Sequence, residues 1–197
     1  MPRLGLNFDR EIPQGTTTVL QRKEAAMEKS RDAISQKAFD LARSYEMNYT
    51  GCAQTTLAGI FDALGIENDD VFRSASGLAD GLGLTGDGAC GALVGGSMAI
   101  GYLFGREKKD FPDMLAPMRS YMLVKELHDR FVEQYGSCRC YDIQKRLMGR
   151  TFNLYDPADL EKAAEMAMFD HCSKVAGTAA LLAAEIILRE REKDEGE

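Results

Sequence analysis

Apolar residues recur along most of the chain with the period of an α-helix. The first such stripe predicts a helix over residues 22–49, and its members are Ile34, Ala38, Leu41 and Tyr45. The same period predicts further helices over residues 52–64, 68–78, 90–105 and 124–135, after Cys140, and from Asp156 onward. No stretch alternates between apolar and polar residues for long enough to predict a strand. The pattern therefore predicts an all-α fold, a single-domain bundle of six or seven helices.

Residues typical of helix ends lie at several of these boundaries. Gly65 and Gly136 follow apolar stripes and suit the left-handed conformation of a C-cap. Asp156 followed by Pro157 is the pattern of an N-cap and a first helical residue. We therefore expect one last helix to begin there and to carry a continuous apolar stripe as far as Ile186.

Glycine is concentrated around one predicted helix. Ten of the 19 glycines lie in residues 77–105. Residues 77–88 are expected to form a tight loop, because glycine adopts positive φ freely. Gly91, Gly95 and Gly96 each lower the propensity of the following helix by about 1 kcal/mol, which close approach of another backbone would offset. That helix is therefore predicted to be central and tightly packed.

Composition and charge narrow the class of protein. The chain has 197 residues and a net charge of −7, from 24 Lys and Arg against 31 Asp and Glu, which argues against binding nucleic acid. The apolar stretches are shorter than the roughly 18 residues of a membrane span, and no export signal opens the chain. We expect a soluble cytoplasmic protein with no membrane span. Residues 1–21 are expected to be an N-terminal extension, residues 22–190 the helical domain, and residues 191–197 a charged tail.

The chain has five cysteines, at positions 52, 90, 138, 140 and 172. Structural disulfides are rare in the cytoplasm, so repeated cysteine there points to redox or metal chemistry. No C-x-x-C pair is present, which argues against a zinc finger, and no C-x-x-C-H, which argues against a covalent c-type haem.

Three of the cysteines lie at predicted helix starts. Cys52, Cys90 and Cys140 fall at or just before the first residue of a helix, where exposed N–H groups and the helix dipole lower a thiol pKa. Cys172 lies in the middle of the last predicted helix. The alternative for each one is a packing role as a small buried apolar residue.

Two further patterns are candidates for a site. The sequence GLGLTG at residues 81–86 satisfies G-x-G-x-x-G, but it follows a helical segment and no strand, which argues against dinucleotide binding. His171 adjoins Cys172 and is a candidate base or ligand. Neighbouring residues on a helix point about 100° apart, so the two need not share a site. His128 is expected on the polar side of its helix.

Several segments together resemble a known family. They read TGCAQTTLAGIFDALGI, SASGLADGLGLTGDGACGALVGGSMAIGYLFG, FVEQYGSCRCYDI and DHCSKVAG. Over residues 38–187 the chain is similar to the C_GCAxxG_C_C family of redox-active proteins, named for four cysteines. The family is also similar to the cysteine region of split-Soret cytochromes, whose haem-attachment sequence is missing here. Cys138 and a polar insertion over residues 106–120 depart from the family pattern.

The resemblance implies which residues form the site. The four family cysteines fall on Cys52, Cys90, Cys140 and Cys172, as redox-active thiols or as metal ligands. Gly88, Gly91 and His171 are expected to contact whatever occupies the site.

Two kinds of chemistry remain open at this point. The four cysteines either form reversible disulfides or hold an iron–sulfur cluster or another soft metal. In both cases we expect a redox partner protein, while oxidoreductase activity and a homodimer stay open. A bundle that binds a small ligand and uses its cysteines for packing is the third interpretation. We expect Cys140, and not Cys138, to carry the chemistry.

Overall fold

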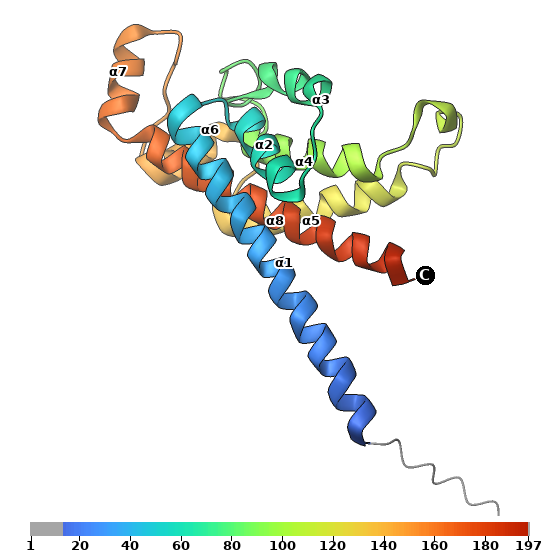
Figure 1. The fold of residues 1–197 in the computed structure, drawn as a ribbon. Coiled ribbons are helices and arrows are strands. Elements are labelled where there is room, and N and C mark those ends of the chain that lie inside the picture. The colour runs from blue at the N-terminus through green and yellow to red at the C-terminus, as the bar shows by residue number, and fades with distance from the viewer. Residues whose placement is uncertain (1–13, 197) are drawn as a thin grey trace, which may run out of the picture.

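The structure is a computed structural model, and it describes residues 14–196. Within that range the fold is all-helical, with eight α-helices and two short 3-10 turns and without a strand, which confirms the predicted all-α class (Figure 1). The α-helices are α1 (Gln14–Tyr49), α2 (Cys52–Leu64), α3 (Asp69–Ser74), α4 (Gly91–Phe104), α5 (Met118–Tyr135), α6 (Cys140–Met148), α7 (Pro157–Glu165) and α8 (Met168–Gly196). The 3-10 turns are η1 (Ser76–Leu78) and η2 (Lys108–Asp110).

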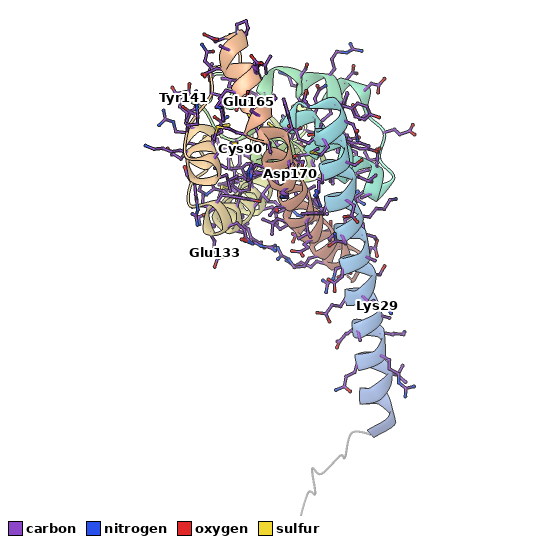
Figure 2. All side chains as sticks on the ribbon, turned by 90° about the vertical axis from the view of Figure 1, so that its left-hand side faces the viewer. Lys29, Cys90, Glu133, Tyr141, Glu165 and Asp170 are labelled. Carbon is purple, nitrogen blue, oxygen red and sulfur yellow. The ribbon has the colours of Figure 1, made fainter. Side chains whose placement is uncertain are left out.

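The long helix α1 has two halves with different surroundings. Its first half projects from the bundle, and Lys29 lies on this projecting part (Figures 1 and 2). Its second half packs along α8 and α2, where Ala38 and Ala42 are fully buried. The helix begins at Gln14, which is eight residues before the predicted start.

Helix α4 lies at the centre of the bundle, against α2, α5 and α8. A Cβ at Gly95 would overlap the carbonyl oxygen of Ala53 in α2, and a Cβ at Gly96 would lie 3.0 Å from Cδ2 of Leu127 in α5. The glycines of α4 therefore let neighbouring helices approach closely. This confirms the prediction that α4 is a tightly packed central helix.

The predicted last helix is in fact two helices. It breaks after α7, where Met166 caps the helix and Ala167 has a φ of +55°, and α8 begins at Met168. The expectation of one helix with a continuous stripe was wrong because α7 belongs to a separate hydrophobic cluster. This small second core has Phe152, Ala163 and Met168 at its centre, with Met148, Leu154, Met166 and Cys172 packed against it.

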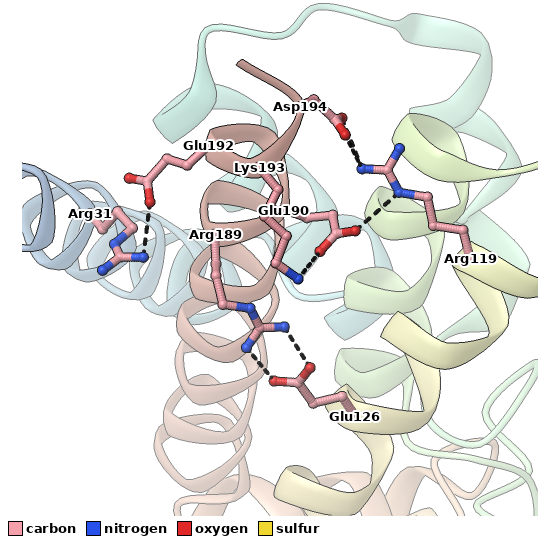
Figure 3. A network of polar contacts seen from close by, with 8 residues as sticks. All are labelled: Arg31, Arg119, Glu126, Arg189, Glu190, Glu192, Lys193 and Asp194. Carbon is pink, nitrogen blue, oxygen red and sulfur yellow. Dashed lines mark hydrogen bonds and ion pairs between the residues drawn. The ribbon is translucent and has the colours of Figure 1, made fainter. Parts of the chain in front are cut away.

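Ion pairs hold the C-terminal half of α8 against α1 and α5 (Figure 3). Arg189 donates to both carboxylate oxygens of Glu126 at 2.8 and 2.6 Å. Arg119 pairs with Glu190 and Asp194, and Arg31 pairs with Glu192. These side chains are partly exposed, so each pair contributes only about 0–1 kcal/mol. Residues 191–196, which were predicted to belong to a charged tail, are thus the helical end of α8.

Helix α8 is long and apolar enough, by length and composition alone, to cross a membrane. Of the most apolar 18-residue window of α8, 61% is buried inside the bundle. Val175, Ala179 and Ala183 of this helix pack in the main core. A buried core helix passes the same test, so this finding is weak evidence for a membrane span.

Candidate functional site

The four cysteines that the resemblance selected line one cavity. Cys52, Cys90, Cys140 and Cys172 all face a space of about 280 Å³, although 120 residues separate the first from the last. They come from α2, the N-cap of α4, α6 and α8, and Cys90 lies in the interior of the bundle (Figure 2). Cys138 is half-buried against the main core and does not line the cavity. Their chemical roles stay predictions.

A short antiparallel pairing places two of the cysteines side by side. Ala89 pairs with Arg139 in an isolated bridge. The Cys90 N–H donates to the Cys138 carbonyl at 2.8 Å, and the Cys140 N–H donates to the Gly88 carbonyl at 3.0 Å. Because α4 and α6 start directly after these bonds, both helix starts lie at the same edge of the cavity.

Gly88 and Gly91 shape the site without lining the cavity. A Cβ at Gly91 would overlap the Cys52 sulfur, so the missing side chain makes room for that thiol. A Cβ at Gly88 would lie 2.7 Å from the carbonyl oxygen of Gly81, so Gly88 allows the loop to close on itself. His171 is half-buried and is not among the residues that line the cavity. The structure therefore does not bring it to the four cysteines.

The glycine-rich loop has an unusual backbone. Residues 80–84 all have positive φ, between +46° and +75°, and three of them are Asp80, Leu82 and Leu84. The left-handed conformation costs a residue with a side chain about 1–2 kcal/mol. The loop is held by internal bonds, such as the Gly86 N–H to the Asp80 carbonyl at 2.8 Å. Strain of this size persists where the surroundings over-determine the conformation, and it is typical of functional sites.

Asp80 connects two of the cysteines to the loop. Its N–H donates to the Cys52 sulfur at 3.4 Å, and its Oδ1 accepts from the Cys140 thiol at 2.7 Å. Gln144 donates to the same Oδ1 at 2.8 Å, while the Gln144 Oε1 accepts from the Phe152 N–H at 3.3 Å. Oδ2 of Asp80 is buried without a partner.

A second carboxyl group lines the cavity from the end of α1. Glu46 is buried, and it accepts a hydrogen bond from the Thr55 hydroxyl at 2.7 Å. Glu46, Asp80 and Gln144 were not among the residues predicted from the sequence. A signal existed for Glu46, because it lies four residues after Ala42 on the buried face of α1. Asp80 gave no comparable signal, because acidic residues are common in loops.

The cavity is acidic. Among its lining residues, all within the described part of the chain, four carry thiols and two carry carboxyl groups, and none is Lys, Arg or His. Burial is the largest cause that raises the pKa of both carboxyl groups. Nearby Asp80 raises the pKa of Glu46 further, whereas the hydrogen bond from Thr55 lowers it. An anion in this cavity would meet only groups that are neutral or negative.

The thiol pKa values differ from the sequence-based expectation. Burial raises the pKa of Cys52, Cys140 and Cys172, and it raises that of Cys90 to about 11. The N–H groups of Ala92 and Leu93, at the start of α4, do lower the pKa of Cys90, but by less than burial raises it. The expectation that helix starts make these thiols acidic was therefore wrong, because desolvation exceeds the effect of the helix N-terminus.

The outer wall of the cavity is apolar. Leu147 and Met148 of α6, Leu154 of the following loop, Leu160 of α7 and Phe169 of α8 form this side. Cys172 also packs against the small second core. The helices and loops from α6 to α8 thus contribute apolar side chains to the lining, while Cys52 and Cys172 stay half-buried.

All five cysteines are free thiols. Across residues 14–196, no group of three or more His, Cys, Asp or Glu side chains is arranged to hold a single metal ion. The four cysteines instead surround a space. They can be oxidised to disulfides if the helices shift, or they can bind a group larger than one ion.

The fold and the cavity define a class of protein: a helical bundle in which cysteines from separate helices meet at one buried acidic cavity. The chain belongs to the family described as "Putative redox-active protein (C_GCAxxG_C_C)", which matches residues 50–186. The match includes all five cysteines and lies within the span of the resemblance, which it confirms. Neither the curated proteins nor the solved structures contain a match to the chain.

Proposed function

We propose that this redox-active protein holds an iron–sulfur cluster, or a cluster of another soft metal, on Cys52, Cys90, Cys140 and Cys172, and that it exchanges electrons with a partner protein. The observation that carries the proposal is the convergence of these four cysteines on one cavity. Thiolates are the usual ligands of iron–sulfur clusters, and such a cluster, when bound, supplies one-electron transfer.

The charges around the cavity support a cationic occupant. Four thiols and two carboxyl groups line the space without a basic side chain. Ionising several of these groups in a buried site is unfavourable unless positive charge accompanies it. Metal ions provide that charge, and a coordinated thiol is deprotonated. The residues present therefore fit a metal cluster.

The thiol pKa values favour this reading over thiol–disulfide exchange. The thiolate is the attacking species in exchange, and a reactive thiol is accessible and has a lowered pKa. Burial here raises the pKa of all four thiols, and Cys90 and Cys140 are buried from solvent. Thiol–disulfide exchange with a partner protein would need the attacking sulfur to become accessible. It would also need an environment that lowers the pKa of that thiol.

The size of the cavity agrees with a group of several atoms. The four cysteines surround about 280 Å³, and no three candidate ligands in the described residues are arranged around a single ion. A cluster of several metal atoms separates its ligands more widely than one ion does. We infer a reducing compartment, such as the cytoplasm, because thiolates that hold a cluster have to stay reduced.

The test is anaerobic purification followed by iron and sulfide analysis, a visible spectrum and a count of free thiols. We expect bound iron and sulfide in the wild-type protein and their loss in Cys140→Ser. Cys138→Ser is the matched control, because Cys138 is two residues away and outside the cavity. Equal losses from the two variants would contradict the assignment of Cys140. A metal-free wild-type protein with reversible loss of two or four thiols on oxidation would replace the cluster by disulfide chemistry.

A further inference from the structure

The loop between α4 and α5 and the start of α5 expose a concentration of apolar side chains. Fifteen large apolar residues are exposed in the described part of the chain, and six of them lie within residues 111–122. These six, here called the 111–122 patch, are Phe111, Met114, Leu115, Met118, Tyr121 and Met122, with exposed fractions from 44% to 84%. The loop projects from the bundle (Figure 1), and four of the six belong to the insertion over residues 106–120. A cluster of this kind marks an interaction surface.

Helix α5 is apolar on two sides at its N-terminal end. Leu123 and Leu127 pack in the main core. Met118, Tyr121 and Met122 are exposed, and they follow the i, i+3, i+4 spacing of one helix face. A helix at the surface of a globular protein normally turns a polar face to solvent. The outer face of α5 therefore has the composition of a face that another chain covers.

A hollow continues this face along α5. It has a volume of about 520 Å³, and Tyr121, Val124, Lys125 and His128 contribute to its lining. Tyr121 belongs both to the 111–122 patch and to the hollow, so the projecting tip of the loop and the hollow share one surface. A projection and a depression on the same surface allow that surface to fit its own copy.

The area and the charges of the patch favour a second copy of this chain as the occupant. At roughly 200 Å² for each large apolar residue, the six expose roughly 750 Å². Each partner of a standard interface buries about 800 Å². Residues 105–117 contain three cations and three carboxylates, although the whole chain carries a net charge of −7. A surface without net charge neither repels its own copy nor attracts an anionic membrane.

We propose that the chain forms a homodimer through the 111–122 patch, with the tip of each copy, Met114 and Leu115, seated in the hollow of the other. A two-fold axis exchanges tip and hollow. The midpoint of the chain between Leu115 and His128 falls at Tyr121 and Met122. These two residues therefore lie at the axis, each next to its own copy. The interface does not involve the cysteine cavity, and it does not depend on what the cavity holds.

Opposite charges meet across this arrangement. Asp113 is exposed beside the tip, where its carboxylate accepts the Leu115 N–H at 2.8 Å. Lys125 and His128 at the hollow share one carboxylate, that of Asp129. The tip of the second copy brings another carboxylate to these two basic side chains. Charge complementarity of this kind fixes the register of an interface.

Sedimentation equilibrium of the full chain over a range of concentrations tests the dimer, under anaerobic reducing conditions that exclude intermolecular disulfides. We expect a species of twice 21.7 kDa. Met122→Glu places two carboxylates at the axis, so the dissociation constant is expected to rise at least about tenfold. Met27→Glu is the matched control, because Met27 is an exposed methionine on the projecting part of α1, and this variant is expected to dimerise like the wild type. Far-ultraviolet circular dichroism checks that both variants keep the helical fold.

Three results would overturn the proposal. The first is a wild-type chain that is monomeric at every concentration. The second is a dimer that Met122→Glu leaves intact, and dissociation of that dimer by Met27→Glu would place the interface on α1. The third comes from flotation with vesicles of phosphatidylcholine and phosphatidylserine. A monomer that floats with these vesicles, and no longer does so as Met122→Glu, would assign the patch to a lipid surface.

Discussion

Replacing Gly91 by alanine tests the link between close helix packing and the position of a candidate ligand. The new Cβ would overlap the Cys52 sulfur, and it would also lie 3.0 Å from the Leu78 carbonyl oxygen and 3.1 Å from the Ala53 nitrogen. Two of these three atoms belong to the backbone. The sulfur is therefore the atom expected to move, and any such shift changes its hydrogen bond from the Asp80 N–H.

The change in the free energy of unfolding caused by Gly91→Ala follows from two opposing contributions. Overpacking of this kind costs about 1–3 kcal/mol. Alanine in a helix gains up to about 1 kcal/mol over glycine, and less in the first turn. With a first-turn gain of about 0.5 kcal/mol, the net destabilisation of Gly91→Ala is about 0.5–2.5 kcal/mol, which lowers the melting temperature by roughly 1–10 °C in a chain of this size.

Gly101→Ala in the same helix is the control. It has no atom within 4 Å of the new Cβ, and Gly101 is exposed. We expect this variant to gain about 0.5–1 kcal/mol from helix propensity alone. Thermal unfolding followed by far-ultraviolet circular dichroism measures both variants, and iron content after anaerobic reconstitution reports on the site. If Gly91→Ala melts higher than the wild type and also keeps its iron, the argument from the Cys52 contact is refuted.

Three further predictions concern the thiols, the buried amide and the break between α7 and α8. In the metal-free protein, the free energy of unfolding is expected to fall as the pH rises above about 9, because the Cys90 thiol has its pKa raised from 9.0 to about 11 only in the folded state. The expected slope is up to about 1.4 kcal/mol per pH unit for each such thiol, and urea unfolding at several pH values measures it. Gln144→Leu removes a buried hydrogen-bond donor to Asp80 and an acceptor for Phe152. It is therefore expected to lower the free energy of unfolding by about 1–3 kcal/mol. A stability equal to that of the wild type would contradict the hydrogen-bond assignment. Ala167→Gly relieves a positive φ at an exposed position, so it is expected to raise the melting temperature by a few degrees; a lower temperature would show that the break is not strained.

The features that sequence alone predicted are local ones. The helical period of apolar residues predicted the all-α fold class. The cap pattern at Asp156 predicted the start of α7, and the glycines of α4 predicted that this helix is closely packed, as it is against α2. The break at Ala167 was missed because alanine favours helix and the apolar pattern continues across it. No local sequence pattern shows that the chain passes from the small second core to the main core at this point.

The part of the site that sequence did not predict depends on tertiary structure. Asp80 contacts Cys140 and Gln144, which lie 60 and 64 residues further along the chain. The sign of the thiol pKa shift also depends on distant residues. A helix start is visible in the sequence, whereas the degree of burial that outweighs it at Cys90 is set by how the helices pack. Recognising the four cysteines required the resemblance to a family.

The main core and the small second core are expected to differ in the free energy that is needed to open them locally. Cys52 and Cys90 pack against the large main core, whereas Cys172 packs against the cluster around Phe152 and Met168. Helix α7 lies at one end of the bundle and packs mainly on α8 (Figure 1). Small peripheral units open at a lower free energy than the whole protein unfolds. Amide hydrogens of α7 should therefore exchange faster than those of α4, and cavity access should follow this sub-global opening without global unfolding.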